Sequence, residues 1–242
     1  MNSVPALAWC AFLCSALGYG MGCINPSYLI ARARGFDIRQ KGSGNAGASN
    51  AVITMGAGVG VASALFDIFK AFAAVQLAGA FFPTLTCARE IAGTACILGH
   101  IFPFYMHFRG GKGLASVAGV ILATDWRVFL VILTLAVVAV LVIDYLFVVP
   151  VGVALLFPWV HAIMTGEYIG ALVLCAASVA IIWRHRVNFR RVRTGTELRF
   201  SYLWRKEKEL ERIRSNVHYD GSAHLPEELE VPEEEHKSSL GS

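Results

Sequence analysis

Residues 128–143 read VFLVILTLAVVAVLVI, a run that contains one threonine and no charged side chain. Similar apolar runs occupy most of the first 183 residues, and they do not alternate between apolar and polar positions. Long uncharged runs are typical of helices that cross a bilayer, whereas the strands of a membrane barrel appear as short alternating segments. The sequence therefore predicts an all-α, polytopic membrane protein.

The composition agrees with this class of protein. Of the 242 residues, 56% are hydrophobic and only 16% are charged, against roughly 25% charged residues in an average soluble protein. The net charge of +4 is concentrated in a few loops and in the C-terminal region. This pattern suits membrane lipid headgroups and anionic substrates, so nucleic acid is not expected as a partner.

About seven stretches qualify as candidate spans when the chain is read outward from this run. They are residues 4–31, 51–82, 87–107, 114–124, 128–143, 146–164 and 168–183. One crossing for each stretch puts the basic segments 32–41, 109–112 and 184–193 on one side, which predicts the N-terminus outside and the C-terminus inside. Two stretches fit less well, because 51–82 is long enough for a hairpin and 114–124 is short for a bilayer.

The character of the chain changes after the last apolar run. Residues 1–200 are predicted to form the membrane domain, and 201–242 a cytoplasmic region. Residues 203–213 have the pattern of a charged helix, with glutamates spaced by four. Residues 215–242 are polar and acidic, so a disordered tail is expected there.

Two glycine-rich basic loops interrupt the apolar sequence. Residues 36–50 read FDIRQKGSGNAGASN, and residues 108–113 read FRGGKG. Glycines allow backbone amides to approach a ligand, and successive amides can form a nest that binds an anion. In the first loop Arg39 and Lys41 add charge, and Ser43 and Asn45 add side-chain donors. The two loops together indicate an enzyme that handles phosphates at the bilayer surface.

Lys112, in the second loop, has two interpretations. It is either a phosphate clamp with glycine amides beside it, or part of a basic cytoplasmic turn. The loop is not a Walker A motif, since GxxxxGK[ST] is absent. His185 and Asn188 lie in RHRVNFRR, directly after the last apolar run. If this segment is helical, their spacing puts both on one face; the alternative is a basic segment that simply ends the span.

Three further polar residues lie within apolar runs. Asp67 and Lys70 share an i, i+3 spacing, and they either neutralise each other or mark a functional site. His100, near the end of an apolar run, is interpreted as structural. The sequence contains no HExxH, no GxSxG, no cysteine–histidine spacing for a metal and no His-x4-Asp pair, so neither a metal nor a cofactor is expected.

Three segments resemble the motifs of a known family in their order and spacing. GCINPSYLIARARGFDIRQKGSGNAGASN (22–50), GHIFPFYMHFRGGKGLAS (99–116) and RHRVNFRRVRTGTELRF (184–200) are similar to the three motifs of the bacterial acyl-phosphate:glycerol-3-phosphate acyltransferases. The resemblance implies a multi-pass enzyme of the cytoplasmic (inner) membrane whose active site faces the cytoplasm. Its substrates would be acyl phosphate and glycerol 3-phosphate. It would acylate the 1-hydroxyl of glycerol 3-phosphate and release lysophosphatidate and phosphate.

The resemblance also implies which residues form the site. By match to the motifs, the catalytic residues are Ser43, Lys112, His185 and Asn188. With the polar residues of the first loop, the predicted substrate-binding residues are Arg39, Lys41, Gly42, Gly44, Asn45, Gly110, Gly111 and Gly113. Glu197 matches a family glutamate that looks structural.

The chain departs from the family pattern in three places. The usual Gly-Ser-Ile-Pro is GCIN at 22–25, the usual Leu-Lys-Gly is FKA at 69–71, and Ile53 replaces an arginine. The last change removes a candidate phosphate ligand. Two rival hypotheses are a transporter or channel for an anionic solute, and a degenerate family member kept for assembly or lipid binding. The sequence does not set the oligomeric state.

Overall fold

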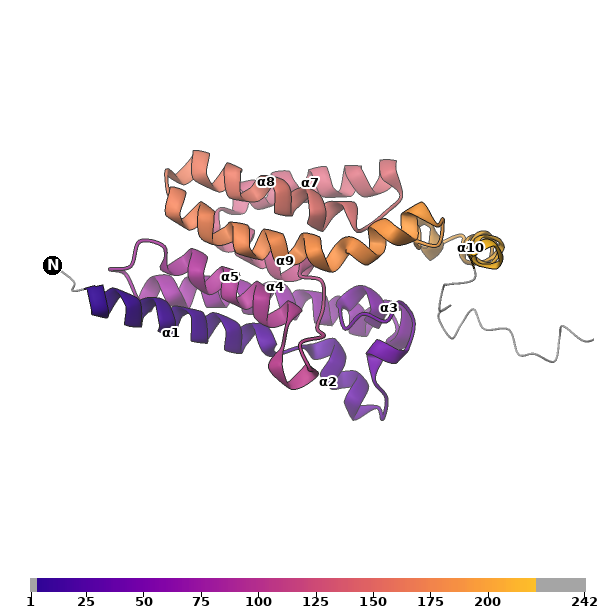
Figure 1. The fold of residues 1–242 in the computed structure, drawn as a ribbon, viewed down its shortest axis with the longest axis horizontal. Helices are drawn as coiled ribbons and strands as arrows, with labels where there is room; N and C mark the ends of the chain where they lie inside the picture. Colours follow the sequence, from indigo (N-terminus) through magenta and orange to yellow (C-terminus); the bar gives the residue numbers. More distant parts are fainter. Residues whose placement is uncertain (1–3, 221–242) are drawn as a thin grey trace, which may run out of the picture.

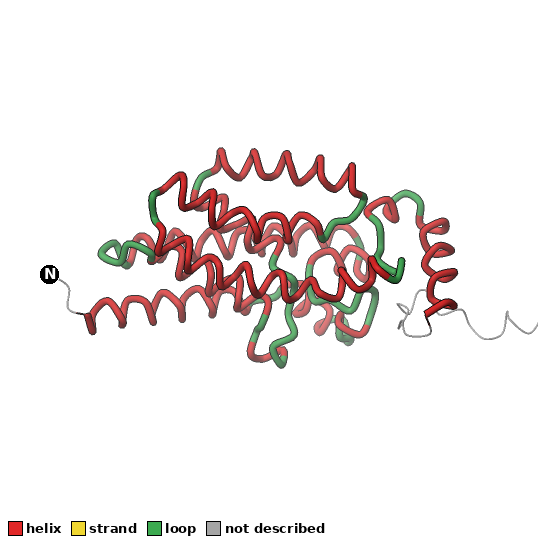
Figure 2. Tube along the Cα trace, turned by 45° about the horizontal axis from the view of Figure 1, so that its top comes forward, coloured by secondary structure: helices red, strands yellow, loops and turns green. Residues whose placement is uncertain are grey.

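The computed structural model describes residues 4–220, and in that part of the chain every regular element is a helix (Figure 2). The five long helices are α1 (Val4–Cys23), α4 (Ala57–Phe81), α7 (Trp126–Ile143), α8 (Val148–Thr165) and α9 (Tyr168–Arg193). The shorter elements are α2 (Pro26–Ala33), η1 (Ile38–Gln40), α3 (Ala48–Met55), α5 (Ala88–Ile101), η2 (Phe104–Met106), α6 (Leu114–Thr124), η3 (Phe200–Leu203) and α10 (Lys206–Asp220). The all-α prediction is confirmed.

The long helices run side by side along the molecule (Figure 1). One layer contains α7, α8 and α9, and the other contains α1, α4 and α5. Within residues 4–220, the five long helices are long and apolar enough to cross a membrane. Many of their large apolar side chains point outward; Leu135, Val142 and Ile163 are each more than half exposed. Such a surface suits lipid rather than water, so the chain is a multi-pass membrane protein.

The main core lies between the two layers. It is formed by small and branched apolar side chains, with Ala74, Ile97, Val120, Phe157 and Ile181 coming from five different helices. This core holds α6 against α4 and α9 against α5. It therefore fixes the ends of these helices, where the polar loops begin.

Glycines let α1 and α5 approach closely. A Cβ at Gly18 would collide with the carbonyl of Ala92, and a Cβ at Gly22 with the carbonyl of Cys96. A Cβ at Gly99, on α5, would collide in turn with the carbonyl of Tyr19. Small residues of this kind bring membrane helices into backbone contact. The packing fixes the end of α1, from which the first glycine loop is reached.

The first predicted span, residues 4–31, is wrong as a single helix. α1 ends at Cys23, and α2 starts a new direction at Pro26. Proline has no N–H and is favoured at the first position of a helix. Asn25 caps α2, since its Oδ1 accepts a hydrogen bond from the Tyr28 amide at 2.9 Å.

Two other predicted stretches are also divided. The stretch 51–82 breaks at Gly56, where φ is 94°, a conformation that favours glycine. The stretch 87–107 stops being α-helical at Ile101, and Pro103 then precedes the turn η2. Each break shortens a helix and releases backbone that forms part of the polar end of the molecule.

The number of membrane crossings stays a prediction. α5 and α6 contain 14 and 11 residues, which is about 21 and 16 Å of helix at 1.5 Å per residue. Both are shorter than the roughly 30 Å of a hydrocarbon core. The five long helices overlap five of the seven predicted stretches, while the seven-span topology and the side on which each terminus lies require an experiment.

The basic segment after the last apolar run is helical, as one of its two interpretations required, and it continues α9. α9 extends to Arg193 and carries His185 and Asn188, both buried, on one face. The predicted charged helix 203–213 is displaced, because α10 begins at Lys206 and includes residues 215–220. The remainder of the predicted acidic tail, 221–242, lies outside the described residues.

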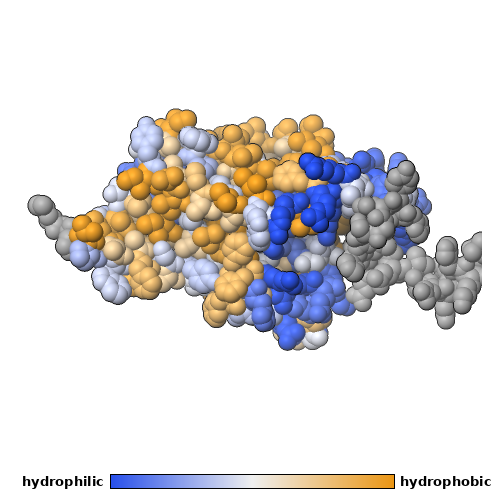
Figure 3. All heavy atoms as spheres, in the orientation of Figure 1, coloured by the Kyte–Doolittle hydropathy of each residue, from blue (hydrophilic) through white to orange (hydrophobic). Residues whose placement is uncertain are grey.

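Polar residues gather at one end of the molecule. In Figure 3 the hydrophilic surface lies at the end where Figure 1 places α2, α3 and the last turns of α9, and the opposite end is mostly apolar. The exposed basic residues of these helices and of the loop between α2 and α3 include Arg32, Arg34, Lys41, Arg190 and Arg193. This one-sided distribution supports the predicted grouping of the basic loops.

The topology can be tested with single cysteines in a variant that lacks the six native ones. We expect cysteines placed at the exposed Lys41, Arg109 and Lys206 to resist an impermeant maleimide in intact cells and to react after lysis. Thr84→Cys, in the opposite loop, is the control and should react in intact cells. Reaction of Arg109→Cys before lysis would contradict the predicted orientation.

Candidate active site

Three segments that lie far apart in the sequence line one cavity at the polar end of the bundle. The cavity has a volume of about 590 Å³. The loop before α3, the loop before α6 and the end of α9 with the segment that follows form most of its polar lining, and residues of α4 and the start of α8 complete it. The predicted residues on these walls are Arg39, Gly42, Ser43, Gly44, Asn45, Lys112, Gly113, His185 and Asn188. All four predicted catalytic residues are thus brought together.

Three predicted substrate-binding residues do not line the cavity. The Lys41 ammonium lies over the Phe36 ring, 5.4 Å from its centroid. The Gly110 amide donates to the Ile101 carbonyl, and the Gly111 amide to the His100 carbonyl. These glycine amides have protein partners, so in this structure the two glycines position Lys112 rather than face the cavity.

The first glycine loop is held by Asn50, a residue that the sequence analysis did not single out. Asn50 is fully buried. Its Oδ1 accepts a hydrogen bond from the Ser43 amide at 2.8 Å. Its Nδ2 donates to the carbonyls of Ile38, Lys41 and Asn45 at 2.8 to 3.0 Å. The Asn50 amide has one acceptor oxygen and two N–H groups, so one N–H is shared between two of these three carbonyls.

These bonds change the expected role of the loop. The Ser43 amide is used by Asn50, and the Gly44 amide donates to the Lys41 carbonyl at 3.1 Å. The expectation of a nest of free successive amides is therefore wrong for these two positions. What the loop presents to the cavity is its side chains, with Gly42 at a positive φ of 55° packed against Asn50.

Asp67, Lys70 and His100 form one buried cluster. Lys70 Nζ is 2.7 Å from Asp67 Oδ1 and 3.2 Å from His100 Nδ1. Lys70 also donates to the carbonyls of Gly22 and Ile24, at the break between α1 and α2. Asp67 and His100 reach the cavity wall, and a Cβ at Gly111 would collide with the His100 ring. The cluster therefore positions the second loop as well as neutralising charge.

A hydrogen bond to the side-chain amide of Asn188 connects Lys112 to α9. Its ammonium donates to Asn188 Oδ1 at 2.6 Å, and Asn188 Nδ2 donates to Glu197 Oε1. Burial, with Arg191 and Arg184 nearby, lowers the pKa of Lys112 to about 8 although Glu197 opposes the shift. Burial also raises the pKa of Glu197, whose Oε2 is buried without a hydrogen-bond partner among the described residues. Glu197, which looked structural, is thus part of the cavity wall.

His185 has a defined tautomer. Its Nδ1 is 2.8 Å from the carbonyl of Ile181, one helical turn earlier. A carbonyl can only accept, so Nδ1 carries the proton and Nε2 is the nitrogen available to a ligand. The neighbouring Arg184 donates to the Gly110 carbonyl at 3.0 Å. α9 therefore presents His185 to the cavity while it holds the second loop.

Arg39 lines the cavity but already has partners. Its guanidinium forms an ion pair with Asp37 at 2.6 Å and donates to the Met106 carbonyl at 2.7 Å. It also lies over the Tyr28 ring, 5.0 Å from the centroid. The Arg39 side chain thus joins the two loops, and a substrate would have to share it.

The sequence gives only weak indications of the site residues that our sequence analysis did not identify. Asn50 follows the glycines at the start of an apolar stretch, a position where a polar residue often holds a turn. Arg191 and Arg199 also line the cavity, but in the sequence they are two among many arginines of a basic segment. Their position on the wall follows only from the path of the chain after α9.

The fold and the site define a class. This is a multi-pass membrane protein with a polar, cation-containing cavity at one end of its bundle, the architecture of a membrane enzyme for anionic substrates. The sequence profile of the family described as glycerol-3-phosphate acyltransferase matches residues 12–195. The chain belongs to this family.

Individual relatives agree with this assignment. A protein named glycerol-3-phosphate acyltransferase 1 from Oceanobacillus iheyensis is 35% identical over 206 residues, which cover 81% of this chain and 97% of the relative. The glycerol-3-phosphate acyltransferase of Shouchella clausii is 37% identical over 196 residues, which cover 74% and 91%. The crystal structure of PlsY (YgiH), an integral membrane glycerol 3-phosphate acyltransferase in its glycerol 3-phosphate form, is similar with a TM-score of 0.71. Its sequence is 31% identical, and the match covers 80% of this chain and 96% of that one.

Asn50→Asp should damage the site, because it removes both N–H donors of the Asn50 amide and turns a carboxylate toward three carbonyls. Two lost N–H donors, at about 0.5 to 1.5 kcal/mol each, predict a clear drop in Tm and at least about tenfold lower turnover. Thr54→Val is the control, since the Thr54 hydroxyl donates within its own helix to the Asn50 carbonyl. Unchanged Tm and turnover in Asn50→Asp, measured on detergent-purified protein, would show that Asn50 does not hold the loop.

Proposed function

We propose that this protein transfers a fatty acyl chain from an acyl phosphate to the 1-hydroxyl of glycerol 3-phosphate, at the cytoplasmic face of the inner membrane. The products are 1-acyl-glycerol 3-phosphate and phosphate. The observation that carries the proposal is the convergence of Ser43, Lys112, His185 and Asn188 on one cavity. Family membership supports glycerol 3-phosphate as the acceptor, and the chemistry of the site supports an activated donor.

The donor makes a strong catalytic base unnecessary. An acyl phosphate is a mixed anhydride, so its carbonyl carbon is already activated. The hydroxyl oxygen forms the new ester bond, and the bond between the acyl carbon and the phosphate oxygen breaks. Phosphate leaves with the electron pair, and a phosphate oxygen accepts the hydroxyl proton. The protein then supplies positioning and charge stabilisation, which can provide most of the rate.

The cavity residues have distinct roles in this proposal. The Lys112 ammonium has three N–H donors, of which Asn188 uses one, so two remain for phosphate oxygens. The Ser43 hydroxyl donates a further hydrogen bond. His185 binds through Nε2, because Nδ1 is fixed by Ile181. Lys112 and His185 are held through their side chains and Ser43 through its backbone amide, by bonds that do not need the substrate.

One wall of the cavity is apolar and suits the acyl chain of the donor. Val52, Ile53, Leu146, Phe147 and Pro150 line the cavity with apolar side chains beside the polar groups. An alkyl chain gains about 0.8 kcal/mol for each buried CH₂. A cavity with cations on one side and apolar residues on the other suits a lipid with a phosphate head. The transporter hypothesis is not retained, because the family is one of acyltransferases.

Lys112→Ala should lower turnover of palmitoyl phosphate and labelled glycerol 3-phosphate by about a hundredfold. A charge-assisted hydrogen bond is worth about 1.5 to 3 kcal/mol, and more in a partly dry site. Arg109→Ala is the control, since Arg109 is exposed in the same loop, and it should stay within about twofold. Near-normal turnover of a folded Lys112→Ala variant would exclude this cavity as the active site.

Ile53 lines the cavity at the position where the family pattern has an arginine. Its side chain lies near Gly42, because a Cβ added there would be 3.3 Å from Ile53 Cγ2. No aliphatic side chain can bind a phosphate, and Arg39 is already paired with Asp37. The site is therefore one cation short of the family pattern at this wall.

Ile53→Arg should lower the KM for glycerol 3-phosphate about ten- to a hundredfold, since one charged hydrogen bond is worth about 1.5 to 3 kcal/mol. The KM for acyl phosphate should change less. Ile53→Gln, of similar size without charge, is the control. If Arg39 compensates instead, Arg39→Ala is severe and Ile53→Arg is neutral. An unchanged KM in both variants would refute the site geometry proposed here.

A further inference from the structure

The chain continues past the region that matches the family. The family profile ends at residue 195, whereas α10 begins at Lys206. The PlsY chain is covered to 96% by only 80% of this chain. α10 is therefore an addition to the matched core, and its contacts show what it can do.

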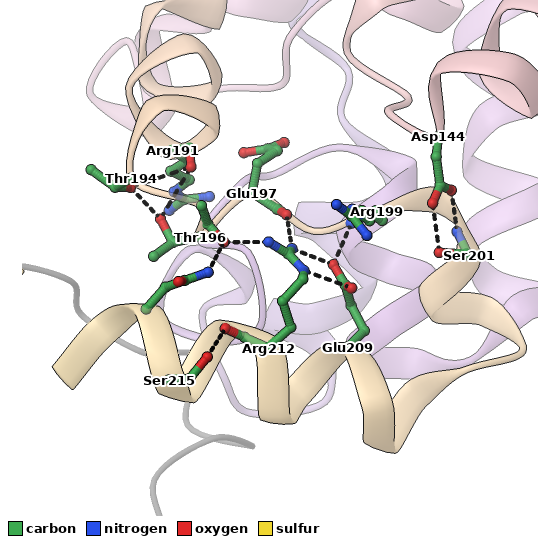
Figure 4. A network of polar contacts seen from close by, with 12 residues as sticks. Asp144, Arg191, Thr194, Thr196, Glu197, Arg199, Ser201, Glu209, Arg212 and Ser215 are labelled. Atoms are coloured by element: carbon green, nitrogen blue, oxygen red, sulfur yellow. Dashed lines mark hydrogen bonds and ion pairs between the residues drawn. The ribbon is translucent and has the colours of Figure 1, made fainter. Parts of the chain in front are cut away.

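Arg212 connects α10 by hydrogen bonds to the turn at residues 194–197, which follows α9 (Figure 4). Its guanidinium donates to the carbonyls of Gly195 and Glu197, the latter at 2.7 Å. The same group pairs with the Glu209 carboxylate, with Nε 2.9 Å from Oε2. One arginine thus uses its planar fork for two main-chain carbonyls and one carboxylate.

Three further side chains hold the segment 195–201, which contains this turn. Glu209, which is 5% exposed, accepts a hydrogen bond from the Arg199 amide at 3.0 Å. Asn216 donates from Nδ2 to the Gly195 carbonyl at 3.0 Å. On the other side of the segment, the Asp144 carboxylate accepts hydrogen bonds from the Ser201 amide and hydroxyl, both at 2.7 Å. The turn is therefore fixed by its backbone.

The inner side of this turn carries Glu197. Its carboxylate accepts a hydrogen bond from Asn188 Nδ2, which leaves Asn188 Oδ1 to accept from Lys112. If Glu197 moved away, the amide of Asn188 would lose what orients it and could turn its NH₂ toward the ammonium. The NH₂ group of Asn188 and the ammonium of Lys112 are both donors, so this arrangement would displace Lys112. The contacts of α10 therefore reach Lys112 through two residues.

We propose that α10 is a positioning element of the acyl-transfer site, in which Arg212, held by Glu209, fixes the Glu197 turn and thereby orients Asn188 and Lys112. Arg212 does not line the cavity, so it acts through Glu197 rather than on substrate. The proposal rests on the function proposed above for Lys112 and Asn188.

The test compares Arg212→Ala with Arg214→Ala in the full-length protein, assayed with palmitoyl phosphate and glycerol 3-phosphate well below the Tm of each variant. Arg214 is a matched control, because it is exposed on the same helix and has the same charge. We expect kcat to fall at least about tenfold in Arg212→Ala and to stay within about twofold in Arg214→Ala. Arg212→Lys should recover only part of the loss, since an ammonium cannot reproduce the fork.

The pH profile separates positioning from mere stabilisation. Lys112 faces Glu197, Asn188, Arg191, Arg184 and His185. The Lys112 ammonium is charged below its pKa of about 8 in the free protein, so kcat/KM, which reports the free enzyme, should fall as the pH rises through that value. The charge of Glu197 keeps this pKa up. If Glu197 is displaced in Arg212→Ala, the alkaline limb of the pH profile, where activity falls as the pH rises, should move to lower pH. Loss of a purely structural contact would leave this limb at the same pH.

Each outcome decides one question. An inactive wild type, or a fully active Lys112→Ala, overturns the proposed function. An active wild type whose kcat and alkaline limb are the same in Arg212→Ala and Arg214→Ala overturns only the role of α10. If Arg212→Ala does not fold, Glu209→Gln replaces it. Removing that carboxylate charge should lower kcat and shift the limb in the same direction, and an unchanged profile would refute the proposal.

Discussion

A break in a membrane helix leaves main-chain carbonyls without partners, and in this protein the Lys70 ammonium satisfies them. The carbonyls of Gly22 and Ile24 accept hydrogen bonds from Lys70 Nζ where α1 stops and α2 begins. Lys70 is buried at this break, so the carbonyls that face it find their partner inside the protein rather than in water. The charge of Lys70 is in turn balanced by Asp67 at 2.7 Å. Because this ion pair lies on α4, the change of direction that leads to the first glycine loop is fixed against the centre of the bundle.

The same cluster positions the second loop. His100 Nδ1 is 3.2 Å from Lys70 Nζ, and the His100 carbonyl accepts a hydrogen bond from the Gly111 amide. The ring leaves no room for a Cβ at Gly111, and the backbone at His100 leaves none at Gly110. The glycines before Lys112 are therefore required by close packing. Both glycine loops are rigid structures whose main-chain groups are largely used inside the protein, and they place side chains at the cavity.

The sequence predicted the features that depend on local pattern. Apolar length predicted the long helices, i, i+3 spacing predicted the common face of His185 and Asn188, and the motifs predicted that their loops share one site. The break before Pro26 was also readable, since Asn-Pro is a common start of a helix, but the apolar composition on both sides hid it. Other features required the tertiary structure. The Ser43 amide looked free because its partner, Asn50, reaches it only when the loop closes, and nothing in a run of charged residues marks Arg212 as the one that binds the Glu197 turn.

The way in which Lys112 is held explains how a buried cation can stay available to a substrate. A direct ion pair with Glu197 would neutralise the ammonium and use the donors that a phosphate needs. The structure instead places the neutral amide of Asn188 between the two charges. The amide fixes the direction of Lys112 with a single hydrogen bond and leaves two N–H donors unused by it. Because burial has already lowered the pKa of this lysine to about 8, an arriving phosphate both binds the cation and stabilises its charged form. Orientation comes from the protein and full charge from the substrate, so the electrostatic contribution is strongest when the substrate is in place.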